Sequence, residues 1–168
     1  KRLIEEEMQL AFRIQSGLLP KEKPRLPGLR LHGHSRPSRQ VGGDYYDYVQ
    51  LPDGRTAMIV ADVAGKGVAA ALVMARVSAE AKFCLATEPR PGAAMNRLND
   101  RLCLLQIDRF VTMVILVLDP RTHQVTIVNA GHMPPLCRRG DGTVEELGAA
   151  EAGIPLGINS GVEYQETA

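Results

Sequence analysis

The chain begins with a segment in which apolar residues recur at helical spacing. The stripe lies within residues 3–19 and consists of Ile4, Met8, Ala11 and Leu18, with Leu3, Leu10 and Ile14 beside it. Pro20 ends the pattern. Two interpretations stay open: an amphipathic helix packed on its own domain, or a coiled-coil connector that links an upstream sensory domain and pairs two subunits. The stripe is too short to decide between them.

A Pro-rich linker over residues 21–28 is followed by patterns typical of β-strands. The predicted strands cover residues 29–35, 45–51, 56–63, 110–118, 124–129, 135–138 and 143–147. Short turn sequences separate the paired segments, and the clearest of them is Pro52, Asp53 and Gly54. Because such short connections join antiparallel neighbours, we expect hairpins.

Two helices are predicted between the two groups of strands. An Ala-rich segment over residues 67–87 predicts the longer helix, and residues 93–106 predict the second. The residues expected on one apolar face of the longer helix are Val68, Ala71, Leu72, Ala75, Ala79 and Phe83. The order of strands, helices and strands again predicts an α+β fold, with antiparallel sheets covered by helices.

Composition narrows the class of protein. A chain of 168 residues that is 45% hydrophobic is expected to form one compact domain. The formal net charge is +1 with scattered Lys and Arg, which argues against nucleic acid as the main partner. No apolar run is long enough to cross a bilayer. Three cysteines without Cys-x-x-Cys spacing favour a reduced, cytoplasmic setting over a zinc site.

Two acidic residues carry the candidate chemistry. Asp44 begins one strand of the hairpin around Gly54, and Asp62 ends the other. In an antiparallel pair these positions are neighbours, and glycines beside them permit close backbone approach. Two carboxylates brought together repel each other, and a hard divalent cation that prefers oxygen ligands removes that penalty. The pair therefore predicts a site for Mg²⁺ or Mn²⁺.

Plainer interpretations of the same residues stay open. Asp62 could cap the following helix, and Asp44 could satisfy a turn. The glycines near Lys66 suggest a phosphate loop, but Val60 replaces its first glycine and Gly67 its hydroxyl residue, so nucleotide binding is excluded. Lys66 is then either a solvated side chain or a group that attracts an anionic substrate.

The histidines are weaker candidates. His32 and His34 alternate on a predicted strand and could share a metal, although such residues more often belong to the surface or the core. His132 follows the end of a predicted strand. It either bonds the nearby loop or orients a group in a cleft, and we favour the structural interpretation.

Three motifs in order carry a resemblance to a known family. They are residues 41–47 (VGGDYYD), 62–67 (DVAGKG) and 129–135 (NAGHMPP). Together they resemble the PPM-type metal-dependent serine/threonine phosphatases, in their bacterial SpoIIE/RsbU-like branch. Residues 11–20 (AFRIQSGLLP) look like the helix that leads into such domains, and residues 153–157 (GIPLG) are similar to a late segment of them.

The resemblance implies a fold and a site. It implies two β-sheets packed face to face with helices outside, and two Mn²⁺ or Mg²⁺ ions held at one end. The implied metal ligands are Asp44, Asp62 and the backbone carbonyl of Val63. The nucleophile is then a water activated by the metals, so no catalytic side chain is expected. Supporting or substrate-side roles are expected for Gly43, Asp47, Lys66 and His132.

One departure from the family pattern concerns the end of the chain. The family continues with two further aspartate motifs that supply metal ligands, and nothing after Gly157 matches them. Four other aspartates cannot replace the missing ligands, because the residues around them do not match either motif: Asp100, Asp108, Asp119 and Asp141. Because the chain also begins with Lys1, we expect a piece of a longer protein, with a linker or switch helix over residues 1–20 and a truncated phosphatase domain over residues 21–168.

Two functions follow as hypotheses. The first is a phosphatase that acts on a phosphorylated anti-sigma-factor antagonist, is switched by an upstream sensory domain, and forms a homodimer through the N-terminal helix. The chain as it stands is expected to bind metal weakly and to be inactive. The second is a non-catalytic interaction module that keeps the fold and docks a partner, with the helix over residues 3–19 as its dimer interface.

Overall fold

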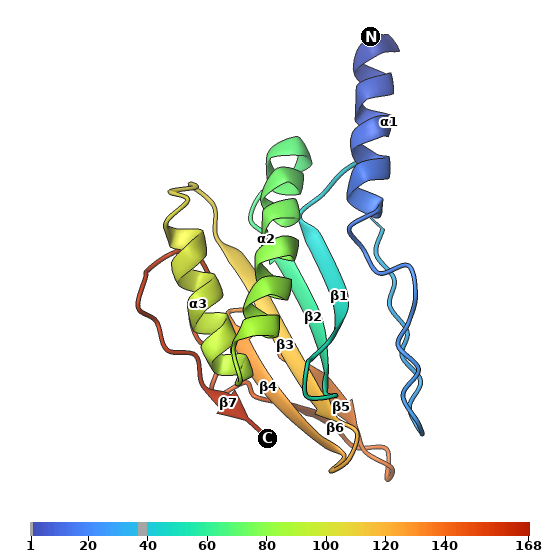
Figure 1. The fold of residues 1–168 in the computed structure, drawn as a ribbon, viewed down its shortest axis with the longest axis vertical. Coiled ribbons are helices and arrows are strands. Elements are labelled where there is room, and N and C mark those ends of the chain that lie inside the picture. Colours follow the sequence, from blue (N-terminus) through green and yellow to red (C-terminus); the bar gives the residue numbers. More distant parts are fainter. Residues whose placement is uncertain (1, 37–39) are drawn as a thin grey trace.

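The computed structural model describes residues 2–36 and 40–168. Its elements are α1 (Arg2–Ser16), β1 (Asp44–Gln50), β2 (Thr56–Val63), α2 (Gly67–Thr87), α3 (Pro91–Cys103), β3 (Val111–Asp119), β4 (Gln124–Ala130), β5 (Leu136–Arg138), β6 (Val144–Glu146) and β7 (Glu166–Thr167) (Figure 1). The predicted bounds of β2 and α2 are confirmed. Of the helices in the described residues, none has the length and apolar character that a membrane span requires.

Five strands form one antiparallel sheet. Their order is β1-β2-β3-β4-β7, and α2 and α3 cover one face of it (Figure 1). Side chains alternate along β2, so that Ala57, Ile59, Ala61 and Val63 point into the core beneath these helices. Met58, Val60 and Asp62 point to the other side, here called the open face. This arrangement confirms the α+β class with an antiparallel sheet.

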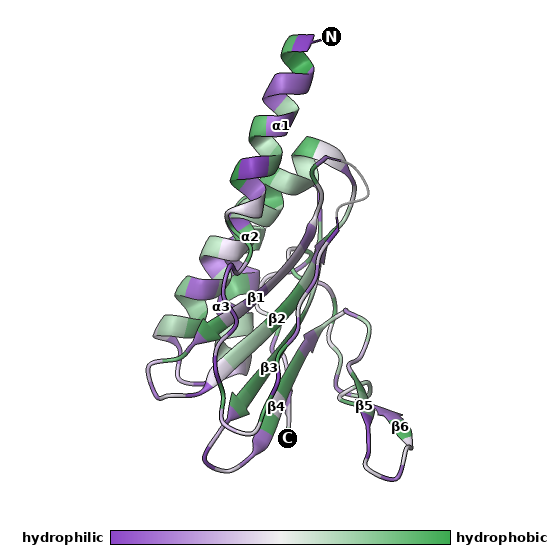
Figure 2. Ribbon diagram, turned by 90° about the vertical axis from the view of Figure 1, so that its right-hand side faces the viewer, coloured by the Kyte–Doolittle hydropathy of each residue, from purple (hydrophilic) through white to green (hydrophobic). Residues whose placement is uncertain are grey.

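The described residues do not contain a second sheet stacked on the first. The remaining strands, β5 and β6, form a hairpin that stands apart from the five-stranded sheet (Figure 2). The predicted strand over residues 29–35 is wrong, because this segment has no strand assignment. It lies instead against the open face, where Gly33 packs so closely on Tyr46 that an added Cβ would lie 2.4 Å from its ring.

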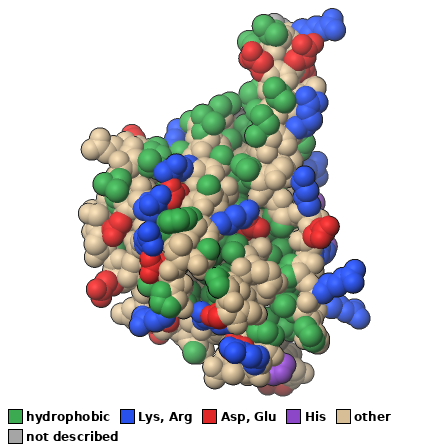
Figure 3. All heavy atoms as spheres, viewed as in Figure 1, with side chains coloured by type: hydrophobic (Ala, Val, Ile, Leu, Met, Phe, Trp, Pro, Cys, Tyr) green, Lys and Arg blue, Asp and Glu red, His purple; other side chains and the backbone are tan. Residues whose placement is uncertain are grey.

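The predicted apolar face of α2 is also wrong. Val68, Leu72 and Phe83 are 47%, 67% and 44% exposed. The helix instead buries a face that includes Ala70, Val73, Met74, Val77 and Ala81. Because α2 is apolar around most of its circumference, the helical period alone could not select the buried side. Figure 3 shows hydrophobic side chains at the surface over α2 and α1.

Polar residues of α3 hold the C-terminal segment in place. The fully buried Asn99 accepts a hydrogen bond from the Gly157 N–H at 2.9 Å and donates one to the Asn159 carbonyl at 2.7 Å. Asp100 accepts a hydrogen bond from the Gly161 N–H at 2.8 Å. These bonds position residues 157–161 beside the sheet, which lets β7 pair with β4.

Candidate functional site

Asp44 and Asp62 face each other across the β1–β2 hairpin. The strand register pairs them directly, at the end of the sheet that lies beside the first turn of α2. Their neighbours Tyr45 and Ala61 are buried beneath the helices, so both carboxylates belong to the open face. The structure thus brings together the two acidic residues that the hairpin pattern placed side by side.

The two carboxylates influence each other electrostatically. Burial raises the pKa of Asp62, and the negative charge of Asp44 raises it further. Among the described residues, neither carboxylate has a Lys or Arg within ion-pair distance. A cation between them would relieve this repulsion.

Gly43 lets the ends of the two strands approach closely. Its carbonyl accepts a hydrogen bond from the Val63 N–H at 3.3 Å. A Cβ added at Gly43 would lie 2.7 Å from the Val63 carbonyl oxygen, closer than real Cβ contacts allow. Only glycine therefore fits beside this carbonyl, which is the backbone oxygen expected as a metal ligand.

The structure excludes the plainer role of Asp62 as a helix cap. The residue that precedes α2 is Lys66, and no side-chain hydrogen bond caps the helix there. Lys66 is exposed and has extended backbone geometry between Gly65 and Gly67, which have positive φ angles of 104° and 72°. Its side chain is therefore exposed at the start of α2, three residues after Val63.

His132 lines the same pocket as Asp44 and Asp62. Its backbone N–H donates to the Asn129 side chain at 2.8 Å, and the Asn129 amide donates to the His132 carbonyl at 2.9 Å. Its Nδ1 lies 2.8 Å from Thr112 Oγ1. Burial lowers the pKa of His132, and the charge of Asp62 acts against this shift. The residue is therefore bonded to its loop and also lies at the site.

His32 and His34 line one pocket on the open face, and His34 also lines the pocket that contains Asp44. His32 Nδ1 lies 3.0 Å from Lys23 Nζ.

Asp47 lies away from the site. It is 4% exposed on the helix-covered face, accepts a hydrogen bond from the Tyr45 hydroxyl at 2.8 Å, and pairs with Lys82 at 2.7 Å. Because side chains alternate along a strand, Asp44 and Asp47 point to opposite faces. The predicted supporting role of Asp47 at the metal site is wrong, and its partners indicate that it ties β1 to α2.

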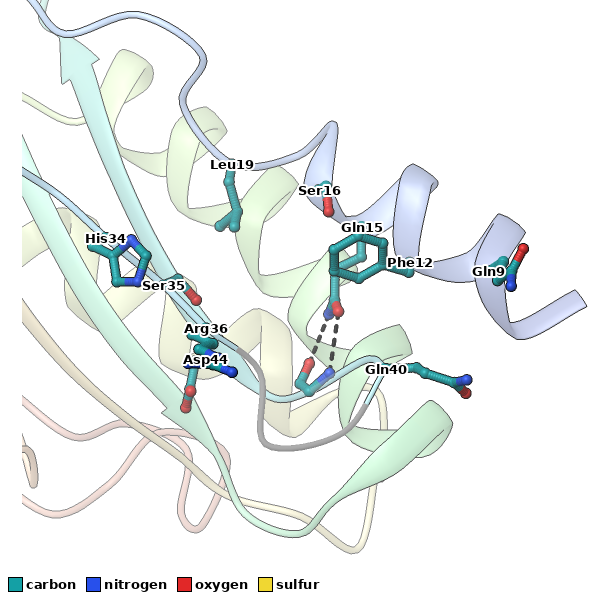
Figure 4. Close-up of a pocket in the computed structure, with 11 residues that line it drawn as sticks. Gln9, Phe12, Gln15, Ser16, Leu19, His34, Ser35, Arg36, Gln40 and Asp44 are labelled. Carbon is teal, nitrogen blue, oxygen red and sulfur yellow. Dashed lines mark hydrogen bonds between the residues drawn. The ribbon is translucent and has the colours of Figure 1, made fainter. Parts of the chain in front are cut away.

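Sequence reasoning missed Gln15. In a pocket between α1 and the segment before β1, its side-chain amide donates to the Gly42 carbonyl at 2.6 Å and accepts from the Gly42 N–H at 3.1 Å (Figure 4). The signal was a polar residue placed at helical spacing between the apolar Ala11 and Leu18. A buried polar position of this kind requires a partner, and here the partner is a backbone peptide.

The expected metal ligands form an incomplete set among the described residues. These residues contain no group of three or more His, Cys, Asp or Glu side chains arranged to hold a metal ion. The expected donors are the two facing carboxylates and the Val63 carbonyl, all of them oxygens, which suits Mg²⁺ or Mn²⁺ rather than a softer metal. The residues present therefore suit such an ion chemically, but they supply only part of the ligands that it requires.

Comparison with known proteins identifies the family. The sequence pattern of the family described as stage II sporulation protein E (SpoIIE) matches residues 52–168. The chain belongs to the SpoIIE family. The resemblance to the SpoIIE/RsbU-like branch of the PPM phosphatases is thereby confirmed.

Two curated relatives of this SpoIIE-family chain come from Bacillus subtilis (strain 168). The phosphoserine phosphatase RsbU is 31% identical over 166 residues, which cover 97% of the chain and 48% of RsbU. The phosphoserine phosphatase RsbP is 28% identical over 166 residues, which cover 96% of the chain and 40% of RsbP. The chain thus spans about half the length of these relatives or less.

Solved structures show the same fold. The SiaA-PP2C domain of Pseudomonas aeruginosa is similar over 99% of the SpoIIE-family chain and 66% of that domain, with a TM-score of 0.77 and 21% identity. The RsbU and RsbW domains of Rv1364c from Mycobacterium tuberculosis match over 77% of the chain and 36% of that protein, with a TM-score of 0.66 and 27% identity.

Proposed function

We propose that this chain is part of a protein serine/threonine phosphatase in bacterial signalling. The observation that carries the proposal is the direct pairing of Asp44 with Asp62 at one end of the sheet. Membership of the SpoIIE family and the similarity to two phosphoserine phosphatases support it.

Asp44, Asp62 and the Val63 carbonyl would hold Mn²⁺ or Mg²⁺, with two ions in the complete domain. When bound, such ions neutralise phosphoryl oxygens and lower the pKa of a water molecule. Asp62 would supply the carboxylate shared by the ions, and Asp44 would supply a further carboxylate ligand. Gly43 keeps the Val63 carbonyl accessible, because any larger residue would crowd this oxygen.

Two further residues have proposed roles toward the substrate. Lys66 presents an exposed positive charge beside the site and would attract the phosphorylated segment. His132, held by Asn129 and close to Thr112, would orient a group in the pocket that it shares with the carboxylates.

The proposed substrate is a small phosphorylated anti-sigma-factor antagonist in the cytoplasm, and the proposed regulator is an upstream sensory domain. Residues 1–20 would act as the switch and residues 21–168 as part of the phosphatase domain. Homodimer formation through α1 is proposed because its exposed apolar side chains need a partner. They include Leu3, Ile4, Leu10 and Ile14.

The test uses the full-length protein with a phosphoserine peptide and Mn²⁺. We expect Asp62→Asn to reduce phosphate release to background, because an amide replaces the shared carboxylate. Asp141→Asn, in the exposed turn between β5 and β6, serves as the matched control and should keep wild-type turnover. Wild-type turnover in Asp62→Asn would disprove the assigned ligand.

The non-catalytic module remains the second candidate because the described residues lack a complete ligand set. Phosphate release, Mn²⁺ binding and oligomeric state, all measured on the full-length protein, separate the two candidates. A full-length protein that neither binds Mn²⁺ nor releases phosphate, yet still dimerises, would support the module.

A further inference from the structure

Arg109 contacts the loop that follows the candidate metal ligands, although it belongs to none of the sequence motifs. It lies in the connection between α3 and β3. Its Nη1 donates a hydrogen bond to the Ala64 carbonyl at 2.8 Å. The Ala64 N–H in turn donates to the Phe110 carbonyl at 2.9 Å. Residues 109 and 110 thus bind both backbone polar groups of Ala64.

The Arg109 guanidinium also occupies the space beside Gly65. A Cβ added at Gly65 would lie 1.8 Å from Arg109 Nη1 and 3.0 Å from its Cζ. The φ angle of Gly65 is +104°, a value that other residues rarely adopt. The tight turn and the closely packed guanidinium therefore depend on the same glycine.

The position of Arg109 is itself fixed by backbone pairing. Two residues further along, Val111 donates a hydrogen bond to Leu156 at 3.0 Å and accepts one from it at 2.8 Å. This pairing joins β3 to residues 153–157, the late motif of the sequence. Among the described residues, no carboxylate lies within ion-pair distance of Arg109. Its side chain donates instead to the Ala64 carbonyl.

The loop held by Arg109 begins at the proposed metal ligands. Ala64 directly follows Val63, whose carbonyl is a proposed ligand, and lies two residues after Asp62. On the other side, the Val63 N–H is bound by the Gly43 carbonyl. The Val63 carbonyl is therefore restrained on both sides. The Gly43 carbonyl binds the N–H of Val63 itself, and Arg109 binds the carbonyl of the next residue, Ala64.

We propose that Arg109 is a positioning residue for the metal centre. It holds the turn at Ala64 and Gly65, so that the Val63 carbonyl and the Asp62 carboxylate keep the orientation that an ion requires. The inference rests on the proposed function. Loss of a side chain that orients a ligand commonly weakens metal affinity about 10- to 100-fold. Lysine would restore the effect in part, because it can donate to the Ala64 carbonyl but lacks the planar, delocalised group.

The experiment measures Mn²⁺ affinity directly, from the electron paramagnetic resonance signal of free Mn²⁺ titrated with full-length protein. We expect Arg109→Ala to raise the Mn²⁺ dissociation constant about 10- to 100-fold, and Arg109→Lys to raise it less. Arg138→Ala, an exposed arginine of β5, is the matched control and should bind as wild type. Thermal unfolding of each variant shows whether the fold is intact.

Wild-type Mn²⁺ affinity in a folded Arg109→Ala variant would overturn the inference. If that variant does not fold, Arg109→Lys and Arg109→Gln decide, and wild-type affinity in both would overturn it. Asp62→Asn separates this failure from failure of the proposed function. If Asp62→Asn abolishes Mn²⁺ binding while the Arg109 variants bind as wild type, only the role of Arg109 is wrong. If Asp62→Asn binds as wild type, the metal site itself is wrong.

Discussion

The side-chain amide of Gln15 binds both backbone polar groups of Gly42, two residues before Asp44. Gln15 is 8% exposed, and its amide also contacts the sulfur of the buried Met74 on α2. The C-terminal end of α1 is thus joined to the segment that carries Gly43 and Asp44. A displacement of α1 would have to move that segment or break these bonds. These bonds therefore couple the position of α1 to that of the segment before Asp44.

Replacing Gln15 should weaken both the fold and the site. Gln15→Ala leaves the Gly42 N–H and carbonyl without their partner, which costs about 1–3 kcal/mol in free energy of unfolding. Urea unfolding measures this loss, and a Mn²⁺ titration measures the effect on the site. Gln9→Ala, on an exposed position of the same helix, is the control. Equal stability of the two variants would show that the Gln15 bonds do not hold α1.

Replacing Gly43 should be more damaging than replacing a glycine in open space. Gly43→Ala places a Cβ against the Val63 carbonyl, and such overpacking typically costs about 1–3 kcal/mol. We also expect weaker Mn²⁺ binding, because this oxygen must shift. At Gly140 an added Cβ meets nothing within 4 Å, so Gly140→Ala is the matched control for thermal unfolding and Mn²⁺ titration.

Asn99 should be the most sensitive polar position of α3. Asn99→Ala removes the partners of the Gly157 N–H and the Asn159 carbonyl, with an expected loss on the order of 2–4 kcal/mol. Urea unfolding of full-length protein gives the value. Asn159→Ala keeps the backbone carbonyl and removes only an exposed side chain, and it should change stability little. A small loss of stability in both variants would contradict the conclusion that α3 holds the C-terminal segment in place.

The buried Glu80 predicts a pH dependence of stability. A hydrogen bond from Arg101, together with the charges of Arg101 and Arg76, lowers the pKa of Glu80. Because the folded pKa lies below the unfolded value, the stabilisation is fully present above the ordinary Glu pKa of about 4.3 and is lost as the pH falls through the lowered value.

Glu80→Gln should therefore reduce stability by about 1.5–3 kcal/mol at neutral pH and much less in acid. Unfolding in urea at a series of pH values gives both numbers. Glu145→Gln, at an exposed ion pair with Arg139, should cost less than about 1 kcal/mol. A loss in Glu80→Gln that does not change with pH would disprove the role of its charge.

The local features of this protein followed from the sequence by itself. Gly54 has the positive φ that a tight turn requires, so the hairpin and the facing positions of Asp44 and Asp62 could be predicted from neighbouring residues. The bounds of α2 were predictable because Gly67 precedes the Ala-rich segment and Pro89 follows it. In both cases the residues that determine the structure are close together in the chain.

Tertiary structure alone decided the remaining features. It selected the buried face of α2, because a helix that is apolar on several sides can pack in more than one way. It placed Asp47 beneath the helices, and it left residues 29–35 without strand pairing. It also joined Gln15 to Gly42 and Arg109 to Ala64, which are 27 and 45 residues apart. Such hydrogen bonds between distant residues have no periodic pattern in the sequence, since each depends on where the folded backbone brings its partner.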